Sequence, residues 1–234
     1  ALYPSIPHDL GIASLSDFLS ARGVRREQVR GICDMAEFVL KNNVFEFNSQ
    51  LYLQTSGTAI GTKMAPSYAN IVMAEFEQRV LNRCDFRPHA YWRFIDDIFM
   101  VWTHGVDKLN DSLNLLNSEN SALKFTSEHS KCVNFLDVRV TLSESDTITT
   151  DIYYKETDSH QYLDPSSCHP HHIIENLPYS QALRISRICS DENTTKSRLK
   201  ELAGFFVRRG YKKNDVRDQI ERARTGGPRP RPQA

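Results

Sequence analysis

The chain has 234 residues with 29 basic and 29 acidic side chains, so its formal net charge is zero, and 40% of its residues are hydrophobic. This composition suits a globular protein with a sizeable core. It argues against a uniformly basic nucleic-acid protein, and no apolar run approaches the ~20 residues of a membrane span. The charge is unevenly placed, however, because residues 208–234 carry +6 and the preceding residues carry −6.

The cysteines and the first residues bear on cellular location. Five scattered cysteines without a CxxC pair indicate reduced thiols and an intracellular protein. The opening ALYPSIPHDL has neither a methionine nor a charged leader, so no signal peptide is expected and the N-terminus looks like a cut.

Apolar periodicity predicts the elements of the first half of the chain. A short strand end is expected at residues 2–6, where Pro4 and Pro7 close an apolar run. The further predicted elements are, in order, a helix from Ser14 or Ser16 to Leu19, a helix at 26–42, a strand at 45–53, a Gly/Thr-rich loop and helix at 55–84, a β segment at 91–102 and a helix at 107–118.

The second half of the chain changes from strands to helices. Strands are predicted at 123–127, 135–142 and 147–154, a His/Pro-rich loop at 164–172, and helices at 179–189, 193–209 and 213–224. Gly210 is a plausible helix stop. The last ten residues, TGGPRPRPQA, are typical of a disordered tail.

The segment YWRFIDDIFM at 91–100 is the most informative part of the sequence. Its adjacent carboxylates, Asp96 and Asp97, stand between apolar arms that we expect to be buried, at the tip of a hairpin. Two carboxylates in an apolar setting need a cation, and Mg²⁺ takes carboxylate and phosphate oxygens together. The alternative is a solvated Asp-Asp turn between two ordinary strands.

The segment GTAIGTKMAPSYANIVM at 57–73 supplies context for this pair. Gly57 and Gly61 would let the backbone approach a ligand closely, and Pro66 would begin a helix. Such a loop could pack against a template base and an incoming nucleotide, or be a plain loop before an N-terminal proline.

The phrases LYPSIP, GTKMAPSYAN and FIDD, in this order and spacing, resemble reverse transcriptases of Penelope-like retroelements, and more distantly telomerase reverse transcriptases. The resemblance continues through KFTSEHS, VNFLDV and PYSQALRISRICS. It implies an α+β fold: a right-hand polymerase palm, with an antiparallel sheet backed by helices, at 1–162. A thumb-like helix-turn-helix region would occupy 163–224, before the tail at 225–234.

The resemblance also implies roles for individual residues in an RNA-directed DNA polymerase. Asp96 and Asp97 match the catalytic pair that binds two Mg²⁺ ions, and Tyr3 matches the residue that rejects a ribose 2′-OH. Gly61 and Pro66 match the loop and helix that support template and nucleotide, with Ile60 where many relatives carry Gln. Phe135, Leu136 and Asp137 match the primer grip, and Lys124 is a candidate phosphate-side cation or proton donor.

The family's first palm motif is an aspartate just before the LYPSIP phrase, and the chain as given starts after it. We therefore expect this chain to be inactive alone in two-metal nucleotidyl transfer. The alternative is a catalytically inactive, nucleic-acid-binding remnant of such an element.

The C-terminal helices carry the basic residues expected to contact phosphates: Arg184, Arg187, Arg198, Arg208, Arg209, Lys212 and Lys213. A solvated helical face is the alternative. The expected partners are an RNA template, a DNA primer and deoxynucleoside triphosphates, in the nucleus and away from membranes. The cluster CHPHH at 168–172 spaces its ligands too closely for tetrahedral zinc, so a connecting loop is favoured.

Overall fold

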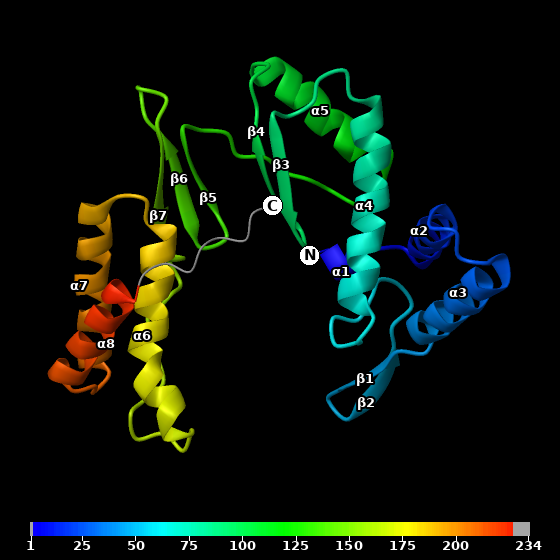
Figure 1. Ribbon diagram of the computed structural model, residues 1–234. Helices are drawn as coiled ribbons and strands as arrows, with labels where there is room; N and C mark the ends of the chain where they lie inside the picture. Colours follow the sequence, from blue (N-terminus) through cyan, green and yellow to red (C-terminus); the bar gives the residue numbers. More distant parts are fainter. Residues whose placement is uncertain (1, 227–234) are drawn as a thin grey trace. The chain divides into compact units, whose positions relative to one another are not determined.

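The computed structural model describes residues 2–226 and forms two compact units, which divide between Ser127 and Glu128 (Figure 1). The first unit contains helices α1 (Leu2–Ser5), α2 (His8–Ala21), α3 (Arg26–Lys41), α4 (Ala65–Arg83) and α5 (Val106–Glu119), with hairpins β1 (Val44–Phe47)–β2 (Gln50–Leu53) and β3 (Ala90–Phe94)–β4 (Asp97–Val101). The second contains the sheet β5 (Cys132–Phe135), β6 (Val138–Leu142) and β7 (Ile148–Ile152), then α6 (His171–Ile188), α7 (Glu192–Arg208) and α8 (Lys213–Thr225). The expected mixture of helices with antiparallel sheets, followed by a helical region, is confirmed.

Helix α4 is the centre of the first unit. Pro66 lies in its first turn, where a missing N–H costs little, and its apolar residues recur at helical spacing. Tyr68, Val72 and Phe76 are buried in one cluster with Ile6 from the N-terminal segment. Helices α1, α2 and α5 all contact α4, and α3 packs on α2. This helix therefore carries the core on which the hairpin of the acidic pair rests.

The second unit is a three-stranded antiparallel meander in the order β5-β6-β7, with three helices packed together. Its core contains Ile185 from α6, Phe206 from α7 and Val216 from α8. Helix α7 begins at Asp191, whose carboxylate accepts from the Thr194 N–H at 2.7 Å. It ends before Gly210, whose φ of 99° suits glycine, so the predicted helix stop is confirmed.

The N-terminal prediction of a strand end is wrong. Leu2–Ser5 is a short helix because a proline is tolerated in a first helical turn, and the spacing of Leu2 and Ile6 places both in the core beside α4. The predicted strand at 45–53 is instead a hairpin that turns at Asn48 and Ser49, both with positive φ.

Other predicted elements differ in their limits, and the first is α2, which begins at His8 and not at Ser14 or Ser16. The segment at 123–127 forms no strand, because the Asn117 side chain takes both backbone groups of Phe125. The strand predicted at 135–142 is interrupted by a turn at Leu136. Helix α6 begins at His171, eight residues before the predicted start, and it contains Pro178. Most of the predicted tail, from residue 227 onward, lies outside the described residues.

Candidate active site

The acidic pair lies at the tip of the β3–β4 hairpin, as the sequence predicts. Phe94 pairs with Asp97 in the antiparallel register, so Ile95 and Asp96 form the two-residue turn. Asp96 and Asp97 are both exposed to solvent. Both carboxylates are therefore accessible to a cation and its phosphate ligands.

The turn has a strained backbone. Ile95 has φ of 55°, a left-handed conformation that costs a β-branched residue about 1–3 kcal/mol. Two contacts hold it there: its side chain packs against the α4 cluster, and its carbonyl accepts from Arg93 Nη1 at 3.1 Å. The position of Asp96 is thus fixed by the packing of the residue before it.

A buried polar network fastens the hairpin to α4. Glu77 Oε1 accepts from the Tyr91 hydroxyl at 2.6 Å and from Arg93 Nε at 2.7 Å, while Arg93 Nη1 also donates to Asn70 at 3.0 Å. The Glu77 and Arg93 side chains are each only 12% exposed. Burial, followed by its bond to Glu77, raises the pKa of Tyr91, so this hydroxyl remains a donor.

Sequence reasoning missed this network. Glu77 lies next to the core residue Phe76 on α4, and Arg93 lies three residues before Asp96. Arg93, which stands between Trp92 and Phe94, was the available signal, whereas Glu77 is one of several charged residues on α4. Their pairing across 16 residues, however, requires the tertiary fold.

The expectation that both hairpin arms are buried is wrong. Trp92 is 57% exposed and Phe94 is 55% exposed. In the described structure β3 and β4 form a two-stranded sheet, and alternation turns Tyr91 and Arg93 toward α4 and Trp92 away from it. An apolar setting therefore does not force a cation onto Asp96 and Asp97, which are both exposed carboxylates.

The predicted N-terminal and glycine-loop residues meet in the structure. The carbonyl of Tyr3, on α1, accepts from the Thr58 N–H at 2.8 Å, and His8 Nε2 lies 2.8 Å from the Gly57 carbonyl oxygen. Gly57 has φ of 75°, and a Cβ there would lie 2.3 Å from the Pro4 carbonyl oxygen. The absence of a side chain at Gly57 thus lets the loop backbone pack closely against α1, and the loop is hydrogen-bonded to Tyr3.

The other residues predicted to support the nucleotide are open to solvent. Gly61 is exposed, with no atom within 4 Å of a Cβ built on it, and Ile60 is 67% exposed. Pro66 is exposed at the beginning of α4. Lys124 is exposed and donates to the Asn117 carbonyl at 3.2 Å, which gives it a local structural contact.

The predicted primer-grip residues lie at the β5–β6 turn of the second unit. Leu136 has φ of 55°, like Ile95 at the other hairpin, and Asp137 follows it as Asp96 follows Ile95. Asp137 accepts from Arg184 Nε at 2.7 Å, and Phe135 precedes the turn as the last residue of β5. Two residues predicted for different roles, Asp137 and Arg184, therefore form an ion pair.

The predicted phosphate-contacting residues fall into two groups. Arg184, Arg198 and Arg209 have partners within the second unit: Arg198 makes a bidentate pair with Asp151, and Arg209 donates to the Tyr162 carbonyl. The exposed group is Arg187, Arg208, Lys212 and Lys213. None of these four makes an ion pair with a residue in 2–226, although the Arg208 guanidinium lies over the Phe205 ring, 5.1 Å from its centroid.

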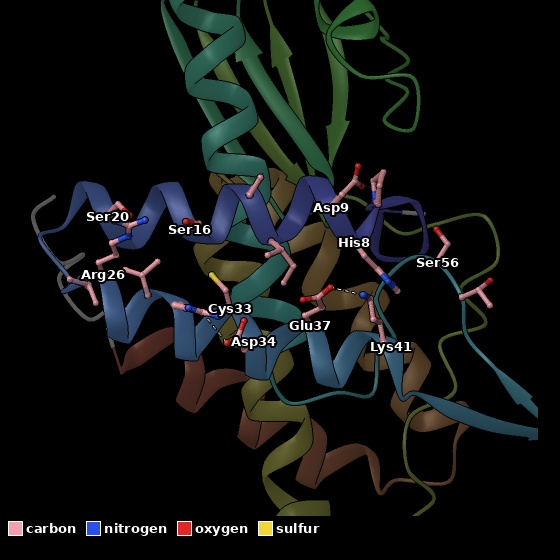
Figure 2. A pocket seen from close by; sticks show the side chains of 17 residues that line it. His8, Asp9, Ser16, Ser20, Arg26, Cys33, Asp34, Glu37, Lys41 and Ser56 are labelled. Atoms are coloured by element: carbon pink, nitrogen blue, oxygen red, sulfur yellow. Dashed lines mark ion pairs between the residues drawn. The ribbon is translucent and has the colours of Figure 1, made fainter.

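A cavity of about 1170 Å³ opens between α2 and α3 (Figure 2). The His8 side chain points from α2 toward α3 in Figure 2, and Glu37 and Lys41 form a 2.5 Å ion pair on α3. Three acidic and three basic side chains line it, so it favours neither sign of charge. It contains neither member of the acidic pair.

The hairpin tip offers two exposed carboxylates, Asp96 and Asp97. Mg²⁺ is commonly held by one or two carboxylates together with phosphates and water, and Asp96 with Asp97 supplies such a pair. Within residues 2–226, no cluster of three or more Asp, Glu, His or Cys side chains could hold a metal ion. The five cysteines are free thiols, and no described helix is long and apolar enough to cross a membrane.

Comparison with protein families assigns the chain. Residues 2–169 match the reverse transcriptase (RNA-dependent DNA polymerase) family, and residues 161–221 match the animal helix-turn-helix domain. The first match covers well over half of the chain, so this protein belongs to the reverse transcriptase family. Comparison with curated proteins gives no significant match.

Proposed function

We propose that this chain is the palm and thumb-like part of an RNA-directed DNA polymerase from a Penelope-like retroelement. The observation that carries the proposal is the Asp96–Asp97 pair, exposed at a hairpin tip that the Glu77–Arg93 ion pair holds on α4. Membership of the reverse transcriptase family supports an RNA template and deoxynucleotide substrates. A nuclear location stays part of the proposal.

The proposed chemistry is two-metal nucleotidyl transfer. Bound Mg²⁺ ions would stabilise the charge that develops on the attacking and leaving oxygens. Asp96 and Asp97 would hold the ions, while Arg93, through the Ile95 carbonyl, keeps the turn in place. Tyr3 would lie beside the sugar and exclude a 2′-OH, and its backbone carbonyl accepts a hydrogen bond from the Thr58 N–H.

The predicted division into a palm at 1–162, a thumb-like region at 163–224 and a tail stays part of the proposal. In it, the helix-turn-helix region binds the primer-template duplex. Its exposed cations outside the groove between α7 and α8, Arg187, Arg208 and Lys212, would contact phosphates. The match to a helix-turn-helix domain at 161–221 supports this role.

The second candidate is nucleic-acid binding without catalysis. It is favoured by the finding that, among residues 2–226, no further carboxylate or imidazole joins Asp96 and Asp97 in a metal-binding cluster. A bridging third carboxylate would normally fix the separation of two ions. We therefore expect purified 1–234 to extend primers poorly unless that ligand is supplied.

Primer extension and metal binding together separate the two candidates. The wild-type chain, with and without an N-terminal extension carrying an aspartate, is assayed on an RNA template with a DNA primer. In parallel, Mn²⁺ binding is followed by electron paramagnetic resonance for wild type, Asp96→Asn and the exposed control Asp17→Asn.

The polymerase proposal expects synthesis from the extended chain and loss of both synthesis and Mn²⁺ binding in Asp96→Asn, but not in Asp17→Asn. Duplex binding with no synthesis from either form would favour the inactive remnant. Robust synthesis by 1–234 itself would overturn the expected inactivity of this chain.

A further inference from the structure

A groove of about 540 Å³ runs between α7 and α8 in the second unit. Its α7 side is a continuous stripe from Lys196 to Val207, and residues from Lys213 to Arg224 form the α8 side. Leu199, Ala203, Val207 and Ile220 give the groove an apolar lining, and Val207 remains 41% exposed. Leu199 itself is only 4% exposed, so the apolar surface open to solvent comes mainly from Val207, with partly exposed Ala203 and Ile220 beside it.

The centre of the groove is hollow because its residues are small. Ala203 and Gly204 lie side by side in sequence in the middle of the α7 stripe. A Cβ built on Gly204 would meet only the end of the flexible Arg208 side chain, at 3.3 Å. Glycine in a helix interior costs about 1 kcal/mol relative to alanine, so local helix stability does not account for it. Small residues allow a third helix to approach closely.

The rim of the groove is basic. Its charged residues are Lys196, Lys200, Lys213, Arg217, Arg224 and one acid, Glu221. Lys196 pairs with Glu192 and Arg224 pairs with Glu221, whereas Lys200 and Lys213 form no ion pair with any residue in 2–226. One free cation is thus available on each side of the apolar lining.

We propose that this groove binds an acidic amphipathic helix of a partner protein. The apolar lining suits Leu-type side chains at i, i+3, i+4 and i+7, and Lys200 and Lys213 would pair with carboxylates that flank them. The stripe from 196 to 207 rises about 16 Å, or three helical turns, which sets the length of the bound segment. A nucleic acid is the poorer occupant, because phosphates and sugars gain nothing from the exposed apolar surface of Ala203, Val207 and Ile220.

This interaction goes beyond polymerisation and does not depend on it. The probe is a fluorescein-labelled synthetic peptide with leucines at the spacing above and glutamates on both flanks, and its partner is the full chain, with binding followed by fluorescence anisotropy. A scrambled peptide of identical composition is the ligand control.

Gly204→Leu fills the groove while it raises the helix propensity of α7, so its fold should be retained. Lys200→Glu with Lys213→Glu reverses the free rim charges, and Lys212→Glu is the matched control beside the groove. We expect binding to fall at least tenfold in the first two variants, to change less than twofold in the control, and to weaken with added salt for the wild type.

Three results would overturn the proposal. The scrambled peptide could bind as tightly as the designed one, or Gly204→Leu, with an unchanged circular dichroism spectrum and melting temperature, could bind the peptide like wild type. The third result has two parts: an RNA–DNA duplex displaces the peptide from the wild type, and the duplex binds Gly204→Leu tenfold more weakly than the wild type. This result would make the groove a nucleic-acid contact.

Discussion

Replacement of Glu77 by alanine tests the network that positions the acidic pair. The change leaves Arg93, whose side chain is 12% exposed, without its carboxylate partner, and it removes the acceptor of the Tyr91 hydroxyl. Loss of one partner of a buried ion pair costs about 3–5 kcal/mol. Because Arg93 keeps the Asn70 and Ile95 acceptors, we expect the lower end, about 3 kcal/mol.

Tryptophan fluorescence can follow this loss in urea. The two tryptophans of the chain, Trp92 and Trp102, lie in β3 and directly after β4, so they report on the first unit. With a slope of ~1.5–2 kcal/mol per molar urea, a loss of about 3 kcal/mol lowers the midpoint by roughly 1.5–2 M. Glu77→Gln keeps an acceptor and should lie between this variant and wild type.

The matched control removes a carboxylate from an exposed pair on the same unit. Asp34 lies 3.9 Å from Arg30, with side chains 68% and 85% exposed, so Asp34→Ala should change stability by less than about 0.5 kcal/mol. If Glu77→Ala shifted the midpoint no more than Asp34→Ala, the buried pair could not be what holds the hairpin on α4. In that case the positioning role given to Arg93 would be withdrawn.

Three further predictions concern other parts of the chain. Gly57→Ala should destabilise the first unit by more than ~1–2 kcal/mol, because of its positive φ and its contact with the α1 backbone, whereas Gly61→Ala, in open space, should be near neutral by urea denaturation. Burial acts to raise the pKa of Asp151, but its partner Arg198 outweighs burial, so the pKa is lowered. The carboxylate therefore stabilises the fold at neutral pH, and this stabilisation is lost as pH falls below about 4. The stability difference between wild type and Asp151→Asn, measured by circular dichroism in urea, should accordingly shrink from pH 7 to pH 3. Arg187→Ala should reduce the salt slope of duplex binding by about one, as measured by anisotropy titrations.

The sequence predicted what local patterns determine. The helix at 26–42, the hairpin tip at Asp96 and the stop at Gly210 each depend on spacing or on a single backbone preference, and the structure has all three. The segment at 2–6 was misread because two prolines suggested an extended chain, whereas the α4 core makes the helical arrangement of Leu2 and Ile6 favourable.

Contacts between distant residues were outside the reach of such patterns. Arg184 and Arg198 were predicted as phosphate contacts from their charge and their place on a helix. In the structure each pairs with an aspartate 47 residues earlier, Asp137 and Asp151 respectively. A basic residue on an amphipathic helix has the same local signature whether it faces a phosphate or a carboxylate of its own domain, so only the fold distinguishes the two.

This distinction changes what the neutral net charge means. The +6 at residues 208–234 suggested one basic surface for nucleic acid. In the structure, Arg209 is bonded to the Tyr162 carbonyl, while Lys213 lines the α7–α8 groove and makes no ion pair with a described residue. Some cations thus hold the helical unit together, some lie beside an apolar groove, and some, such as Arg187, are simply exposed. Mutagenesis that neutralises them as one group would mix stability, partner binding and duplex affinity; one variant from each group, compared at equal salt, separates the three.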